Sequence, residues 1–508
     1  MTRYRCRVAG VGVGAGADDD ISSPSLHFRS GAPAKPGVAG KLVKPTAVDR
    51  SERISVSRSG LDDIANCLRS EARTGAGVDA WTVGQNVATT SGNVIAHAAA
   101  DAIEVSEYLG IPYATPPTGP LRFQRPVEFN GSYVINATDF GFACLQPGDG
   151  GQNSVPQSED CLTLNIWTKP QVGERKKAIL VWVHGGAYSF GSSRAPGYNG
   201  EYISNQTDVL SSGHFGFPGN PVTASNLGLL DMRLAIHWIR NNAAAFGGDV
   251  NRITIFGQSA GASMADFYSY SYASDPIANG FILMSATVDG FPVATASRWL
   301  RIAETAGCGA STTDPNLITE CMRSKTAREL ISALSSEDTG IGAVPAFRPG
   351  VDDIIIFADY SSQYSASGGY LIGNNQNEAG LLTRSTGDGN PSWRYRYFGD
   401  FPNLTVSADL PSGAYHGAEL QPLFDTVPHS PIPSTSEEVA IGDYLRSAWA
   451  AFSKDPAHGL LSYEDGWPKY EPTEETLVRL AFGNKTGTNL ALGNAYDGPC
   501  HFLERSVM

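Results

Sequence analysis

A serine between two glycines, at the end of an apolar run, is the feature that most limits how this chain can fold. Residues 253–256 are β-branched or aromatic, and Ser259 lies between Gly257 and Gly261 before residues that favour a helix. A serine on a tight strand-to-helix turn exposes its Oγ above the edge of a sheet, and the glycines prevent a backbone clash. The following helix offers free N–H groups to an oxyanion. The pattern predicts a nucleophilic serine, although five residues alone would equally fit an ordinary strand–loop–helix connection.

A second glycine-rich motif follows a predicted strand at 177–184. That strand is almost continuously apolar, which is typical of a central strand buried on both faces. It ends in His184-Gly-Gly-Ala187, where small residues let main-chain N–H groups approach a ligand closely. In isolation the motif is more simply a glycine turn. Together with the motif around Ser259 it indicates an oxyanion hole.

Strands and helices alternate through the middle of the chain. Strands are predicted at 158–167, 177–184 and 253–256, and a helix at 227–246 has Asn226 as its expected N-cap. Earlier β-type segments predict an antiparallel start to the sheet, at 83–90, 92–97 and 102–109. This order predicts an α/β fold with a large, mostly parallel sheet and helices on both faces. Such sheets bind ligands at the carboxyl ends of their strands.

Composition argues against several classes of partner. The net charge of −14 gives no electrostatic reason to bind nucleic acid or an anionic membrane surface. No window approaches 18 uninterrupted apolar residues, so no integral membrane span is expected. Residues 1–79 are rich in Gly, Ala, Ser, Pro and Arg and lack periodicity, which predicts a disordered tail before a folded domain at 80–508. The beginning of that tail makes a poor secretory leader.

Four motifs occur together in a fixed order: Glu159-Asp-Cys-Leu-Thr-Leu-Asn165, His184-Gly-Gly-Ala187, Phe246-Gly-Gly-Asp249 and Gly257-Gln-Ser-Ala-Gly261. Together they resemble the type-B carboxylesterase/lipase family, the cholinesterase-like branch of the α/β hydrolases. The resemblance runs from about Trp81 to the C-terminus. It implies an α/β hydrolase fold and hydrolysis of a small-molecule or lipid ester, with no cofactor and no metal. It leaves the oligomeric state open.

The implied reaction needs a base and an acid beside Ser259, because a serine hydroxyl is a weak nucleophile at its free pKa. In α/β hydrolases the chain order is serine, acid, histidine. Of the histidines that follow Ser259, His416 lies in a glycine-flanked loop that matches the family's histidine loop, so it is the expected base. His429 and His458 neighbour prolines and fit surface loops.

The expected acid is Glu378, which follows a short apolar strand ending near Asn375. A carboxylate just past a strand end points at the active face of such a sheet, and its Asn-Glu-Ala-Gly setting resembles the family's acid loop. Asp352 and Asp353 are the rival acids and are more simply structural.

The resemblance also assigns further residues. The oxyanion donors would be the backbone N–H groups of Gly186, Ala187 and Ala260. The implied disulfides pair Cys144 with Cys161 and Cys308 with Cys321, free buried thiols being the alternative. No partner is expected for Cys6, Cys67 or Cys500.

Five Asn-X-Ser/Thr sequons are candidate glycosylation sites: Asn130, Asn136, Asn205, Asn403 and Asn484. With the family and the cysteines, they favour a secreted, extracellular protein.

Two segments depart from the family's pattern. Only Ser211-Ser-Gly-His214 stands where the family has a full apolar strand, so a core strand is expected to be absent near 211–214. A long helical segment between the acid and the histidine is expected to be missing near 384–390. Besides an active hydrolase, the sequence is compatible with a non-catalytic binding or adhesion protein on the same scaffold, or with an inactive truncated relic.

Overall fold

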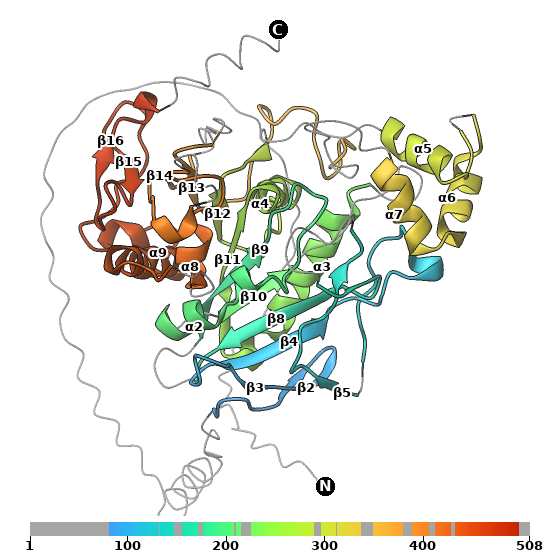
Figure 1. The fold of residues 1–508 in the computed structure, drawn as a ribbon, viewed down its shortest axis with the longest axis horizontal. Helices are drawn as coiled ribbons and strands as arrows, with labels where there is room; N and C mark the ends of the chain where they lie inside the picture. Colours follow the sequence, from blue (N-terminus) through green and yellow to red (C-terminus); the bar gives the residue numbers. More distant parts are fainter. Residues whose placement is uncertain are drawn as a thin grey trace, which may run out of the picture. The chain divides into compact units, whose positions relative to one another are not determined.

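A computed structural model describes residues 81–131, 133–146, 155–170, 176–207, 210–214, 225–288, 296–310, 312–336, 349–378, 389–405, 412–427 and 432–496. Its helices and strands are drawn in Figure 1. The strands are β1 Val87–Thr89, β2 Gly92–Ile95, β3 His97–Ala98, β4 Ser106–Pro112, β5 Val134–Asn136, β6 Ala143–Cys144, β7 Gln157–Ser158, β8 Thr163–Thr168, β9 Lys177–Val183, β10 Leu210–His214, β11 Gly248–Gln258, β12 Gly280–Met284, β13 Gly369–Asn375, β14 Ser392–Tyr397, β15 Leu477–Leu480 and β16 Leu490–Ala491. The helices are α2 Glu201–Thr207, α3 Leu227–Asn242, α4 Ala260–Ser271, α5 Ala296–Thr305, α6 Pro315–Ser324, α7 Ala327–Ser336, α8 Leu420–Phe424 and α9 Ser436–Lys454.

One large mixed sheet organises the described domain. Its strand order is β16-β15-β14-β13-β12-β11-β9-β10-β8-β4-β3, and the run from β10 through β9 to β15 is parallel. The strands β8, β4 and β3 at one edge and β16 at the other pair antiparallel. Because β9, β11 and β13 run the same way, their carboxyl ends meet at one edge of the sheet. The segments that follow these three strands carry residues 184–187, Ser259 and Glu378, and His416 follows β14, which runs parallel to β13.

The predicted central strand at 177–184 is confirmed as β9, all seven residues of which are buried. Its side chains alternate between two hydrophobic cores, as the pleat of a strand requires. Ile179, Val181 and Val183 pack in the core that contains α3 and α4 side chains. Leu180 and Trp182 pack in the core that contains α8 and α9 side chains. Helices therefore cover both faces of the sheet (Figure 1).

The expectation that a core strand is absent near 211–214 is wrong. Residues Leu210–His214 form β10, which pairs parallel with β9 on one side and antiparallel with β8 on the other. Ladder hydrogen bonds come from the backbone alone, so a short run of serine and glycine can fill the position of an apolar strand. The segment expected to be missing near 384–390 falls mostly on residues 379–388, which lie outside the described ranges.

Asn226 precedes α3, but it does not cap that helix with its side chain. Its Nδ2 instead donates to the Gly350 carbonyl oxygen and to Asp352 Oδ2, both at 2.9 Å. Asn226 is therefore the N-cap residue of α3, as predicted, but its side chain bonds to the distant loop at 350–352 instead of to the first turn of the helix.

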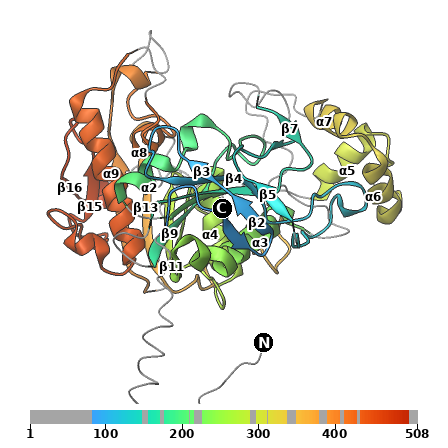
Figure 2. The same cartoon turned by 90° about the horizontal axis from the view of Figure 1, so that it is seen from below.

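Helices α5, α6 and α7, here called the α5–α7 cluster, have a small core of their own that includes Trp299, Met322 and Leu334. Figures 1 and 2 show the cluster at the opposite end of the described domain from α8 and α9. Reciprocal hydrogen bonds join it to the body: Arg122 Nη1 donates to the Arg323 carbonyl oxygen at 2.8 Å, and Arg323 Nε donates to the Arg122 carbonyl oxygen at 3.0 Å.

Across the described ranges, no helix has both the length and the hydropathy needed to cross a membrane. The predicted tail at 1–79 lies outside the described residues.

Candidate active site

Ser259 stands on the turn between β11 and α4, as the sequence predicts. Its backbone has φ 57° and ψ −129°, a conformation that costs free energy for a non-glycine residue and that the surrounding packing must hold in place. The Ser259 amide donates to the Met284 carbonyl oxygen at 2.8 Å, which fixes the turn to the end of β12. Glycine is required on both sides of Ser259 because there is no room for a side chain at either position. A Cβ on Gly257 would lie 2.5 Å from the Gly261 carbonyl carbon, and one on Gly261 would lie 2.1 Å from the Val183 oxygen.

The loop after β9 packs directly against the nucleophile turn. A Cβ on Gly185 would lie 2.8 Å from the Gln258 carbonyl oxygen and 3.0 Å from Ser259 Cβ, so only glycine permits this approach. Gly186, Ala187 and Tyr188 all have positive φ, at 116°, 52° and 63°. Among the described residues, the N–H groups of Gly186 and Ala187 donate to no protein acceptor. The Ala260 N–H lies in the first turn of α4, where no helical partner exists.

His184 begins this loop as a buried, neutral residue. Its Nδ1 lies 2.7 Å from the Gly185 carbonyl oxygen. Burial lowers the pKa of His184 to about 4, an effect that the hydrogen bond to Gly185 only partly offsets. The ring therefore carries no charge near neutral pH and stabilises the backbone of the loop.

Glu378 and His416 come together, although 38 residues separate them. His416 Nδ1 lies 3.2 Å from Glu378 Oε1. Two contacts of Asn377 hold their loops side by side: its amide donates to the Ala414 carbonyl oxygen at 2.9 Å, and its Nδ2 donates to the Ser412 carbonyl oxygen at 3.0 Å. The Glu378 side chain is only 4% exposed, whereas that of His416 is 47% exposed. The carboxylate is thus enclosed and the imidazole faces open space.

The second ring nitrogen of His416 contacts the residue before the serine. Gln258 Nε2 lies 3.1 Å from His416 Nε2. An amide nitrogen can only donate, so His416 Nε2 accepts and Nδ1 carries the hydrogen that is donated to Glu378. This tautomer leaves the Nε2 lone pair directed toward the last residue of β11, next to Ser259.

Opposing effects set the protonation of His416. Burial disfavours the charged ring, but the hydrogen bond and charge of Glu378 and the charge of Glu419 favour it, and the net result is a pKa of His416 above its ordinary value. In the described part of the chain, no group of three or more His, Cys, Asp or Glu side chains is placed to hold a metal ion.

Comparison with known proteins agrees with this geometry. The sequence model of the Carboxylesterase family matches residues 82–391, more than half of the chain. The chain belongs to the carboxylesterase family. The predicted α/β hydrolase fold is thereby confirmed, with a mixed sheet covered on both faces.

Among the curated relatives of this carboxylesterase are two fungal proteins matched over most of their length. It is 31% identical to secreted lipase 5 of Gibberella zeae over 75% of this chain and 87% of the lipase. It is 30% identical to chlorogenic acid esterase of Aspergillus niger over 81% of this chain and 93% of the esterase. A shorter match, 34% identical over 45% of this chain and 41% of the relative, is to mouse cholinesterase.

The rival acids of the carboxylesterase have structural contacts. Asp352 Oδ1 accepts from the amides of Ile355 and Ile356 at 2.8 and 2.9 Å, and Asp353 Oδ1 accepts from the amide of Ala358 at 3.2 Å. His458 lies on the surface beside Asp455, at 3.4 Å. His429 lies outside the described residues.

Both implied disulfides are confirmed. Cys144 and Cys161 are joined with an S–S distance of 2.04 Å, and Cys308 and Cys321 with one of 2.08 Å. The second bridge ties the segment that follows α5 to α6. Cys6, Cys67 and Cys500 lie outside the described residues.

The five sequon asparagines fall into two groups. Asn130, Asn136 and Asn205 have exposed side chains. The other two are engaged: Asn403 Nδ2 donates to Glu438 Oε2 at 2.8 Å, and Asn484 Nδ2 donates to the Asp400 carbonyl oxygen at 2.8 Å.

Three side chains at this site were not identified from the sequence. Besides Gln258, they are Ser285, whose Oγ donates to Glu378 Oε1 at 2.6 Å, and Glu419, which is 1% exposed and accepts from Asn375 Nδ2. The position of Glu419, three residues after His416 in the same loop, was a usable signal. Nothing in the sequence near Ser285 points to Glu378.

Proposed function

We propose that this protein is a carboxylic ester hydrolase that acts through Ser259, His416 and Glu378. One observation carries the proposal: His416 is held between Glu378 at Nδ1 and Gln258 at Nε2, and Gln258 directly precedes Ser259 on the strained turn. A general base must lie within hydrogen-bond reach of the group it deprotonates, and resting structures often show this contact incompletely formed. Membership of the carboxylesterase family, with relatives named lipase and esterase, supports the same reaction.

Each residue has a defined part in the proposed reaction. Ser259 Oγ attacks the ester carbonyl while His416 Nε2 takes its proton, so the Gln258 contact must give way to Ser259 at this step. The carbonyl π electrons move to oxygen, and their return expels the alkoxide, which receives the proton from His416. Water then attacks the acyl-enzyme with the same proton transfers, and the carboxylic acid leaves Ser259 restored. Glu378 holds the tautomer and stabilises the imidazolium.

The oxyanion would be stabilised by the N–H groups of Gly186, Ala187 and Ala260. Within the described ranges these N–H groups have no protein acceptor, and positive φ values at Gly186 and Ala187 turn consecutive amides in an unusual direction. Preorganised donors of this kind are each worth about a hundredfold to a thousandfold in rate. Gly185 supports this role because it brings the loop against Ser259.

Hydrolysis of short-chain 4-nitrophenyl esters by the purified full chain tests the proposal. Ser259→Ala should lower kcat by a factor on the order of 10⁶. The matched control is Ser324→Ala, which alters an exposed serine on α6 and should leave kcat unchanged. A parent chain with no activity, or a Ser259→Ala variant as active as the parent, would refute the proposal.

We further propose that the protein acts outside the cell. Two disulfides are typical of oxidising compartments, and one relative is named a secreted lipase. Of the sequons, the exposed Asn130, Asn136 and Asn205 are the proposed glycosylation sites. Expression through a eukaryotic secretory route should give a protein whose mass falls on treatment with an N-glycosidase; an unchanged mass would count against the glycosylation.

A further inference from the structure

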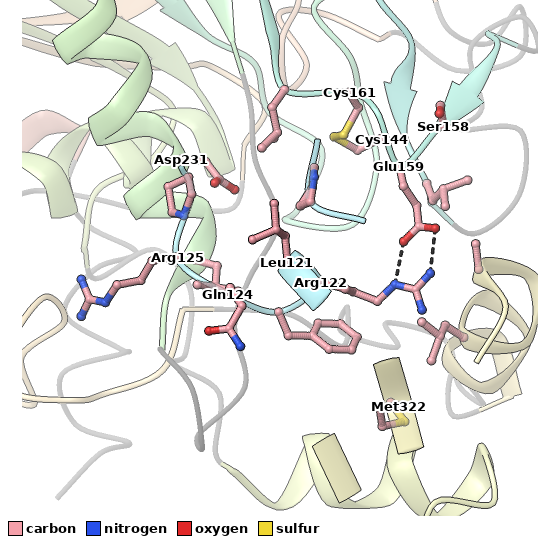
Figure 3. A pocket seen from close by; sticks show the side chains of 18 of the residues that line it. Leu121, Arg122, Gln124, Arg125, Cys144, Ser158, Glu159, Cys161, Asp231 and Met322 are labelled. Atoms are coloured by element: carbon pink, nitrogen blue, oxygen red, sulfur yellow. Dashed lines mark hydrogen bonds and ion pairs between the residues drawn. A yellow bond between two sulfur atoms is a disulfide. The ribbon is translucent and has the colours of Figure 1, made fainter. Parts of the chain in front are cut away.

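An apolar cavity, partly open to solvent, lies between the body of the protein and the α5–α7 cluster (Figure 3). Its volume is about 120 Å³, about ten times the space that one water molecule needs. Neither Ser259, Glu378 nor His416 is among its described lining residues. Phe123 and the Cys144–Cys161 disulfide line it from the body, and Trp299, Met322 and Leu334 line it from the cluster.

Charged groups at the wall do not provide a site for a charged ligand. Arg122 Nε and Nη2 each donate at 2.7 Å to the two oxygens of Glu159, so the pair is mutually neutralised. Asp231, a buried carboxylate, also lines the cavity and would repel an anion. Arg125 also lines the cavity, but its side chain is exposed and extends away from Leu121 and from the disulfide (Figure 3).

The uncharged polar side chain of Gln124 also lines the cavity. Gln124 is half-buried, and its side-chain amide makes no hydrogen bond to the described part of the protein. An amide can donate to a carbonyl oxygen without requiring any charge on the ligand. An aliphatic chain inside the cavity would gain dispersion contacts that an empty apolar space forfeits.

We propose that this cavity is a second, non-catalytic site for an uncharged aliphatic ester, whose chain fills the cavity while Gln124 donates to its carbonyl oxygen. The choice of an ester rests on the proposed hydrolytic function. The preference for an uncharged chain with one carbonyl rests only on the cavity. No covalent bond forms or breaks when a ligand occupies this site.

Calorimetric titration of the Ser259→Ala full chain tests the site, with octan-2-one as a ligand that has the carbonyl but cannot be hydrolysed. Ala327 lines the cavity at the start of α7. Ala327→Phe should fill the cavity and weaken binding at least tenfold, whereas the matched Ala327→Ser should change it less than twofold. Gln124→Leu should weaken binding about three- to tenfold, as expected for one neutral hydrogen bond.

Octanoate and octylamine, with chains of similar length, complete the test, and both should bind more weakly than octan-2-one. Equal octan-2-one affinity in Ala327→Phe and Ala327→Ser, or tighter binding of either charged ligand, would overturn the proposal. If Ala327→Phe lowers the melting temperature, Leu330→Trp fills the same cavity from the next turn of α7. Failure of the hydrolase proposal would appear as a parent without esterase activity, and it would leave these affinities unchanged.

Discussion

His416 Nε2 lies 3.1 Å from the side-chain nitrogen of Gln258, the residue immediately before Ser259. The proposed base is therefore already in contact with the nucleophile turn in the resting protein. The contact also occupies the lone pair that must accept the serine proton. Residue 258 should consequently influence the protonation of His416.

Replacing Gln258 by glutamate should move the acidic limb of the activity profile to higher pH. A carboxylate at this position would stabilise the imidazolium, which raises the pKa of His416 further, and hydrolysis requires the neutral ring. The measurement is kcat/KM for a 4-nitrophenyl ester as a function of pH. Gln258→Met, similar in size but uncharged, is the control and should not move the limb upward. If the acidic limb of the profile stays at the same pH in Gln258→Glu, the side chain at position 258 does not affect the pKa of His416.

Replacing Glu378 by glutamine should have two effects. kcat should fall about 10³- to 10⁴-fold, because the base loses its orienting carboxylate. The acidic limb should shift to lower pH, because Glu378 is the principal cause of the raised pKa of His416. Asp352→Asn is the matched control, since among the described residues this rival acid accepts hydrogen bonds only from Asn226 and from nearby amides. An equal loss of kcat in Glu378→Gln and Asp352→Asn would indicate that the substitution at Glu378 acts by disturbing the fold.

The glycines around Ser259 should be essential for stability as well as for activity. Gly261→Ala places a Cβ against the Val183 carbonyl oxygen at the carboxyl end of β9, and overpacking of this kind costs about 1–3 kcal/mol. Gly197→Ala is the control, because a Cβ there meets nothing within 4 Å. Urea denaturation of the three proteins should give a lower midpoint for Gly261→Ala only. Equal urea midpoints for the parent and Gly261→Ala would mean that the turn at Ser259 shifts enough to accommodate the added methyl group.

Glu419 should make stability depend on pH. Burial, and next the charge of Glu378, raise its pKa above the ordinary value of 4.5. Between the ordinary and the raised pKa, the folded protein holds a proton that the unfolded chain has released, so this group lowers stability as the pH rises through that interval.

Glu419→Gln removes this titration and keeps an oxygen acceptor for Asn375. The stability of the variant relative to the parent should therefore increase with pH, from the ordinary pKa up to the raised one. The free energy of unfolding of both proteins, measured by urea denaturation at about pH 5 and about pH 8, checks this. A difference that is constant or falls with pH would show that Glu419 ionises normally in the folded state.

Local patterns predicted the parts of the site that depend on backbone geometry. The turn at Ser259 and the loop at Gly185–Ala187 require small residues at fixed spacing, and that requirement is visible in the sequence itself. The Glu378–His416 pair came from resemblance to a family, and the structure places these two side chains in contact. By contrast, Gln258 and Ser285 contact residues far away in the chain, so no local signal marks their contacts. Glu419 was marked only by its position three residues after His416.

The error at β10 has a physical cause. The expectation that 211–214 holds no strand rested on its lack of apolar side chains. A strand with partners on both sides draws its stability from the two hydrogen-bonded ladders, and residues Leu210–His214 pair with both β9 and β8. Side-chain composition is a weaker guide for such a strand than for one with a single partner. The tail at 1–79 remains a prediction.

Labelling with a fluorophosphonate, followed by peptide mapping, tests the central claim most directly. Only a serine activated by a neighbouring base reacts rapidly with such a reagent. We expect a single adduct on Ser259 in the parent, slow labelling in His416→Ala, and none in Ser259→Ala. A parent chain that folds but takes up no label, or that is labelled at another serine, would contradict the account.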